Sequence, residues 1–73
     1  MKSIDLHGTK HEDVKRKLDI FFWEMMCKNI QHVEVITGCS TKMKKIVYET
    51  ASDYGIEVVE GISNNGCLLC KLV

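Results

Sequence analysis

The chain has no proline, no surplus of either charge and no long uninterrupted apolar run. With no linker or low-complexity segment in its 73 residues, the sequence predicts a single domain spanning residues 1–73. Ten basic residues balance ten acidic ones, which excludes a protein coated in positive charge. Any contact with nucleic acid therefore has to come from a local patch.

The distribution of apolar residues argues against a membrane or secreted protein. The longest apolar stretch, residues 20–27, is interrupted by Glu24 and is far shorter than the roughly 20 residues that a spanning helix needs. Asp5 lies where the apolar core of a signal peptide would begin, so we expect a cytoplasmic protein. In that compartment the four cysteines are expected to stay reduced.

Hydrophobic periodicity and turn residues divide the chain into six elements. Strands are expected at 2–7, 32–37, 56–60 and 67–73, one helix at about 10–28, and a second helix of about three turns between Thr41 and Gly55. The capping-box spacing from Thr9 to Glu12 marks the start of the first helix. The order β-α-β-α-β-β predicts an α/β fold, more narrowly an α+β two-layer sandwich. In that fold the first three strands run parallel, the last runs antiparallel to its hairpin partner, and both helices pack on one face of a four-stranded mixed sheet.

Apolar side chains on the first predicted helix form two groups. The group at three- and four-residue spacing is expected in the core: Val14, Leu18, Phe21, Phe22 and Met25. Ile20, Trp23 and Met26 fall outside that stripe. They indicate either an exposed patch for a homodimer or protein partner, or a helix that the small domain covers more widely.

The two strand-to-helix loops carry polar residues suited to a ligand. Gly8 and Gly38 leave room for close approach to the backbone, and each loop leads into a helix N-terminus that favours an anion such as phosphate. Three lysines in the first turns of the second helix oppose its dipole, which indicates a polyanionic partner; the alternative is a solvated basic turn. The expected nucleic-acid contacts are Gly8, Thr37, Gly38, Ser40, Thr41, Lys42, Lys44 and Lys45.

Asp5 and His7 are the candidate catalytic residues. They are two positions apart on the first predicted strand, so their side chains are expected on the same face. A carboxylate and an imidazole so placed can orient a nucleophile and move a proton in phosphodiester cleavage. Asp5 would act as general base or, through water, as a ligand of a divalent cation such as Mg²⁺. The alternative is that Asp5 caps the loop and His7 packs at the strand end.

Residues 4–8, Ile-Asp-Leu-His-Gly, resemble the LDLHG motif that opens domains of the Smr (small MutS-related) family. Residues 33–38, VEVITG, stand where that family has a strand ending in HGxG, and residues 65–72 resemble its closing strand. The resemblance covers residues 3–73. It implies a two-layer fold like the C-terminal domain of a bacterial translation initiation factor, nucleic-acid binding, and nicking or endonuclease activity as in several members.

By position, the resemblance carries the family's motif roles onto Asp5, His7, Gly8 and Gly38. Thr37 replaces the histidine of the second motif, Ser40 replaces its second glycine, and Leu68 replaces the usual threonine of the last strand. Threonine can form hydrogen bonds but cannot take or give a proton as a base or an acid near neutral pH. The resemblance therefore implies binding to nucleic acid first and hydrolysis second.

Three functions fit these patterns. The first is a minimal endonuclease, a hydrolase acting on RNA or DNA, that uses Asp5 and His7. The second is a nucleic-acid-binding module without catalysis. The third is a small adaptor that binds another protein through the patch of Ile20, Trp23 and Met26. No metal site is expected from Cys67 and Cys70, because residues three apart on a strand point to opposite faces.

Overall fold

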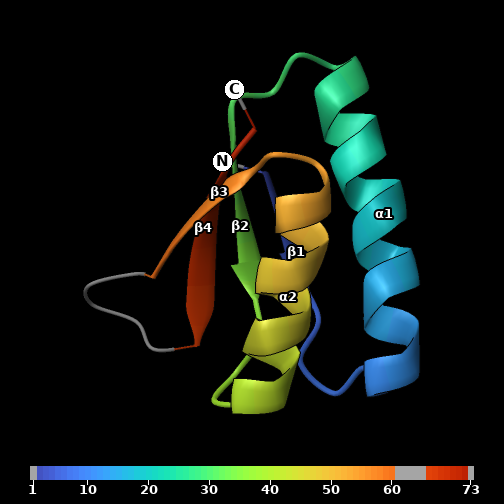
Figure 1. The fold of residues 1–73 in the computed structure, drawn as a ribbon, viewed down its shortest axis with the longest axis vertical. Coiled ribbons are helices and arrows are strands. Elements are labelled where there is room, and N and C mark those ends of the chain that lie inside the picture. The colour runs from blue at the N-terminus through green and yellow to red at the C-terminus, as the bar shows by residue number, and fades with distance from the viewer. Residues whose placement is uncertain (1, 61–65, 73) are drawn as a thin grey trace.

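A computed structural model describes residues 2–60 and 66–72 of the chain. The elements, shown in Figure 1, are β1 (Lys2–Asp5), α1 (His11–Cys27), β2 (His32–Ile36), α2 (Thr41–Asp53), β3 (Glu57–Glu60) and β4 (Cys67–Lys71). This is the predicted order β-α-β-α-β-β. Most of the turn expected between the last two strands, residues 61–65, lies outside the described residues.

The four strands form one mixed sheet in the order β1-β2-β4-β3. β1 and β2 are parallel, and β4 is antiparallel to both β2 and β3. β1, β2 and β3 therefore run in the same direction, as predicted, but β4 inserts between β2 and β3. Both helices cover the same face of the sheet, which confirms the two-layer architecture (Figure 1).

Burial alternates along the central strands β2 and β4, which distinguishes the sheet face beneath the helices from the opposite face. Val33 and Val35 of β2 and Leu68 and Cys70 of β4 are all buried and pair in register beneath the helices. Cys67 is half-buried on the opposite face, so the two cysteines of β4 point apart as expected. Burial raises the pKa of the Cys70 thiol to about 11, so this thiol is protonated and unreactive at neutral pH.

The core stripe predicted on α1 is largely confirmed. Its fully enclosed members are Val14, Leu18, Phe22 and Met25, whereas Phe21 is only half-buried. The side chains of Ile20 and Trp23 are exposed, at 57% and 65%. Met26 packs at the edge of the core, so the predicted exposed patch shrinks to Ile20 and Trp23. Within the described residues, no helix is both long enough and apolar enough to cross a bilayer.

The two helices begin differently. The predicted capping box at Thr9 is wrong: the N-cap of α1 is Lys10, and no side chain caps this end of the helix. The Thr9 backbone N–H instead donates to the Leu6 carbonyl in a tight turn, which shifts the start of the helix by one residue. α2 has a side-chain cap, because the Ser40 Oγ accepts a hydrogen bond from the Met43 N–H at 3.1 Å.

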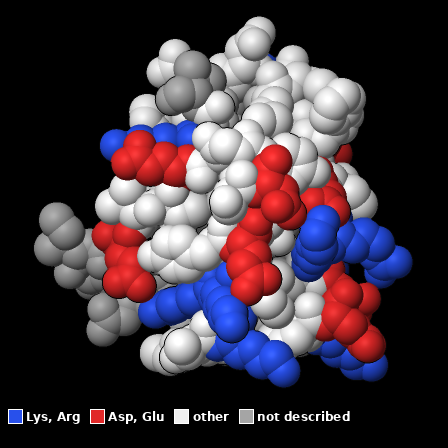
Figure 2. Space-filling model, viewed as in Figure 1, with Lys and Arg blue, Asp and Glu red and all other residues white. Residues whose placement is uncertain are grey.

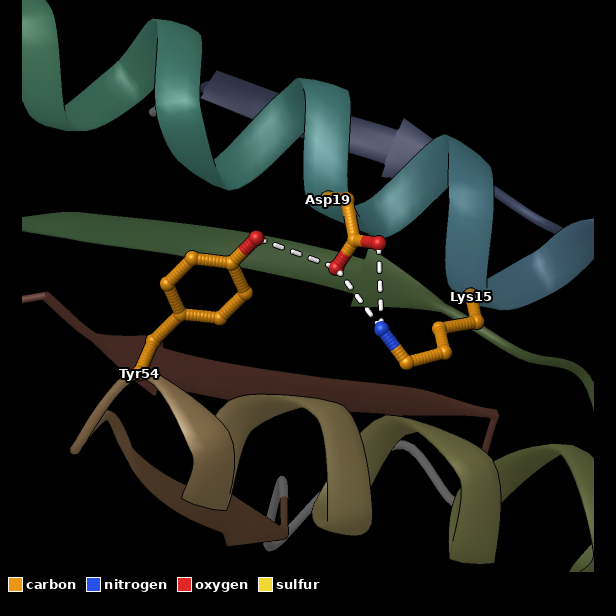
Figure 3. A network of polar contacts seen from close by, with 3 residues as sticks. All are labelled: Lys15, Asp19 and Tyr54. Atoms are coloured by element: carbon orange, nitrogen blue, oxygen red, sulfur yellow. Dashed lines mark hydrogen bonds and ion pairs between the residues drawn. The ribbon is translucent and has the colours of Figure 1, made fainter.

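A polar network ties the C-terminal end of α2 to α1 (Figure 3). The Tyr54 hydroxyl donates to Asp19 Oδ1 at 3.0 Å, and Lys15 Nζ lies 3.1 Å from Asp19 Oδ2. The Tyr54 ring also meets Phe22 edge-on, with ring centroids 5.8 Å apart. The hydrogen bond to Asp19 raises the pKa of Tyr54 above its ordinary value. These contacts fix the two helices side by side over the sheet.

Candidate nucleic-acid interface

The loops that follow β1 and β2 meet at one end of the sheet. Gly38 has a φ of +67°, and a Cβ placed on it would lie 2.9 Å from Cδ2 of His7. Non-bonded carbon atoms pack at roughly 3.5–4.0 Å, so the His7 ring rests against the backbone at a place where a side chain would not fit. The structure thus joins residues of the first and second motifs into one site.

His7 does not share a strand face with Asp5, contrary to the prediction. β1 ends at Asp5, Leu6 turns into the core, and His7 lies in the following turn. The reason is that the Asp5 Oδ1 accepts a hydrogen bond from the His7 backbone N–H at 2.9 Å, which bends the chain out of the strand. Asp5 therefore caps the loop, as one alternative from the sequence predicted. Both side chains remain exposed to solvent.

Thr37 is turned inward. It is 2% exposed, and its Oγ1 lies 3.0 Å from the Gly38 carbonyl oxygen and 3.3 Å from that of Gly66. The backbone N–H groups of Thr37 and Gly38 also donate to the Gly66 carbonyl, at 2.7 and 3.0 Å. Thr37, which the motif resemblance places at the position of the family's second histidine, thus fastens the β2–α2 loop to the residue before β4. It offers a ligand almost no surface, unlike the other predicted contact residues.

The N-terminal end of α2 is basic. Lys42 and Lys45 are exposed and Lys44 is half-buried, and the first turn contains no acidic residue. None of the three lysines forms an ion pair with another described residue. Basic side chains gather over this part of the molecule in Figure 2. The predicted contacts Ser40 and Thr41 lie at the same helix end, beside the Gly38 turn.

A shallow hollow of about 380 Å³ extends this basic end along α2. Its lining is Thr41, Lys44, Lys45, Tyr48, Glu49 and Glu60. Burial and the neighbouring Glu60 raise the pKa of Tyr48, whose side chain is still 39% exposed. The sequence does not indicate this hollow, because Glu60 lies on β3, which the tertiary structure places beside α2 through its pairing with β4.

Among residues 2–60 and 66–72, no three His, Cys, Asp or Glu side chains are grouped closely enough to hold a metal ion.

The fold and this site define a class of small α+β domains in which two glycine-containing strand-to-helix loops meet at one end of a mixed sheet. The sequence matches the family model of the Smr domain over residues 4–65, so the chain belongs to the Smr domain family, as the first-motif resemblance predicts. The structure is similar to the crystal structure of the Smr domain of Thermus thermophilus MutS2, with a TM-score of 0.89 and 14% sequence identity over 100% of this chain and 99% of that one. A comparison with curated protein sequences finds no match.

Proposed function

We propose that this Smr domain binds nucleic acid at the end of the sheet where the two loops meet. The carrying observation is the unpaired basic turn of α2 beside the contact between His7 and Gly38. Smr domains as a family bind nucleic acids and include nucleases. In a chain of zero net charge, three lysines at one helix end form a local patch of the kind that a phosphate backbone recognises.

The physical basis of binding is phosphate recognition. The free N–H groups and positive dipole at the start of α2 attract an anion, and the lysine side chains add mobile positive charges around it. Contacts to phosphates position a nucleic acid without reading its bases. The proposal therefore covers both RNA and DNA, and it requires binding to weaken steeply with salt.

We propose phosphodiester cleavage as a second activity at the same site. Asp5 and His7 are both exposed, and the hydrogen bond between the Asp5 carboxylate and the His7 N–H holds them in one turn. The carboxylate would take the proton from the attacking oxygen, and the His7 imidazolium would give a proton to the leaving oxygen. Thr37 takes no part in this scheme, because its hydroxyl is buried and cannot act as an acid or a base near neutral pH.

The test measures binding and cleavage with labelled single-stranded RNA, duplex DNA and supercoiled plasmid, each with and without magnesium. Wild type is compared with Asp5→Asn and His7→Ala, and with the exposed control variants Asp53→Asn and His32→Ala. We expect cleavage to fall by about 100-fold or more in the first pair, because acid and base groups supply about that much. Affinity should stay within about twofold, and the control variants should match wild type.

The outcomes separate the two activities. Binding without cleavage by the wild type would leave a nucleic-acid-binding module and remove the hydrolase. An absence of salt-sensitive binding to all three substrates would overturn the proposal itself and favour a protein adaptor. A reducing agent is included throughout, since we propose a cytoplasmic location in which the exposed Cys27 and Cys39 stay as thiols.

A further inference from the structure

The outer face of α1 carries an apolar stripe that nothing in the described chain covers. Ile20, Trp23 and Cys27 are all exposed and follow one another at spacings of three and four residues. The exposed Arg16, four residues before Ile20, continues the same line toward the start of the helix. Such spacing keeps them on one side of a helix, opposite the buried stripe that includes Leu18 and Phe22. A solvent-facing helix side is ordinarily polar, whereas here a tryptophan and an isoleucine occupy its centre.

The charged residues beside this stripe would complement the same residues on a second copy of the chain. Lys17 precedes Ile20 and Glu24 follows Trp23, and both side chains are exposed on the same edge of the stripe. Neither forms an ion pair with another described residue. If two α1 helices pair antiparallel, Lys17 of each copy comes to face Glu24 of the other. In a parallel pairing this edge of one helix would face the opposite edge of the other, so Lys17 and Glu24 would not meet and this complementarity would be lost.

We propose that this face is a homodimer surface on which α1 packs antiparallel against α1 of a second copy. In this alignment the Ile20 and Trp23 side chains of both copies come together near the two-fold axis, which repeats each contact. Tryptophan is the side chain most favoured at the centre of an interface, and rim charges fix the register more than they add affinity. The occupant is therefore a second copy of this chain.

The dimer surface is separate from the nucleic-acid interface. The β1–α1 loop, with His7, precedes the N-terminal end of α1, so antiparallel pairing places the two copies' loops toward opposite ends of the helix pair. The 17-residue helix is roughly 25 Å long at 1.5 Å per residue. A dimer would thus hold two separated interfaces on one particle, which widens the footprint of a small domain.

The first experiment follows association with concentration by analytical ultracentrifugation, together with the emission of Trp23, the only tryptophan of the chain. We expect reversible dimerisation with a blue shift of the emission as the concentration rises. Trp23→Ala should raise the dissociation constant at least tenfold, whereas Tyr48→Ala, at an exposed aromatic position on α2, should leave it unchanged. A chain that stays monomeric at every concentration would overturn the dimer.

The second experiment tests the antiparallel register. Lys17→Glu and Glu24→Lys should each weaken self-association several-fold, because each places like charges together twice. Mixing the two variants should restore it, since every Lys17–Glu24 position then pairs opposite charges between the two chains. Glu57→Lys, a matched reversal on the edge strand β3, should change nothing. If the mixture associates no better than either variant alone, the proposed register is wrong.

Discussion

The two strand-to-helix loops of this domain have the same form but lead into helices whose first turns carry opposite charge. Each leaves a parallel strand, passes through a glycine with positive φ, at Gly8 or Gly38, and enters a helix. The first turn of α1 contains Glu12 and Asp13, whereas the first turn of α2 has no acidic residue and begins a run of lysines. Acidic residues stabilise a helix N-terminus but repel phosphate, and lysines do the reverse.

Under the proposed function, this difference separates two tasks within one site. The proposed proton-transfer groups are Asp5, at the end of β1, and His7, in the β1–α1 loop, and they precede a helix that has acidic residues in its first turn. The positive charge proposed to bind phosphate follows the β2–α2 loop, on α2, whose start is stabilised by the Ser40 cap. The contact of His7 with Gly38 brings the two halves together. Fold symmetry at this end of the sheet therefore does not imply equal function.

The largest expected effect comes from removing the positive charge at the start of α2. Replacing Lys42, Lys44 and Lys45 by Gln should weaken binding to duplex DNA by about 10- to 100-fold at low salt, because up to three phosphate contacts are lost. The slope of log affinity against log salt should fall by roughly 0.9 for each contact. Fluorescence anisotropy across a salt series measures both quantities. An unchanged slope would show that the lysines do not touch phosphates.

The next largest effect comes from disturbing the contact between His7 and Gly38, where the two loops meet. Gly38→Ala puts a Cβ against the His7 ring and forces a side chain into positive φ, so we expect a loss of about 1–2 kcal/mol in the free energy of unfolding and at least a tenfold loss of any cleavage. Gly55→Ala is the matched control, because its φ is +69° and no atom lies within 4 Å of the added Cβ. It should cost similar backbone strain without moving His7. Urea unfolding and the NMR shifts of the His7 ring distinguish the two variants.

A smaller effect concerns Thr37, in the place of the family's second histidine. Thr37→Val keeps the shape but removes the hydroxyl that lies near the Gly38 and Gly66 carbonyls, which should cost about 1 kcal/mol of stability. Binding and cleavage should be unchanged once the protein is folded. Thermal unfolding and the cleavage assay are read on the same sample. A loss of cleavage without a loss of stability would assign Thr37 a chemical role.

The smallest expected effect comes from removing negative charge at the start of α1. Glu12→Gln removes one negative charge from the first turn of α1, so affinity for nucleic acid should rise by about twofold at low salt. The helix loses part of its dipole stabilisation, about 0.3–1 kcal/mol. Glu12 is the suitable position because Asp13 already pairs with Arg16, at 3.4 Å. An unchanged affinity would place the bound phosphates away from α1.

Local signals were sufficient for most of the elements. The apolar stripe of α1 predicted its four enclosed residues, and Gly55 correctly marked the end of α2. The errors lie at element boundaries, where polar side chains compete with the backbone. The Asp5 carboxylate accepts a hydrogen bond from the His7 N–H, which shortens β1. A tight turn at Thr9 forms in place of the capping box.

The sequence by itself determined the order of the elements, the glycines of both loops and the motif residues of an Smr domain, because these depend on periodicity and turn chemistry within short segments. Only the tertiary structure decided that β4 lies between β2 and β3, that His7 rests on Gly38 and that Thr37 is buried. Each of these depends on which distant strands pair. Pairing is fixed by burying the apolar faces of the whole sheet together, and no local pattern encodes it.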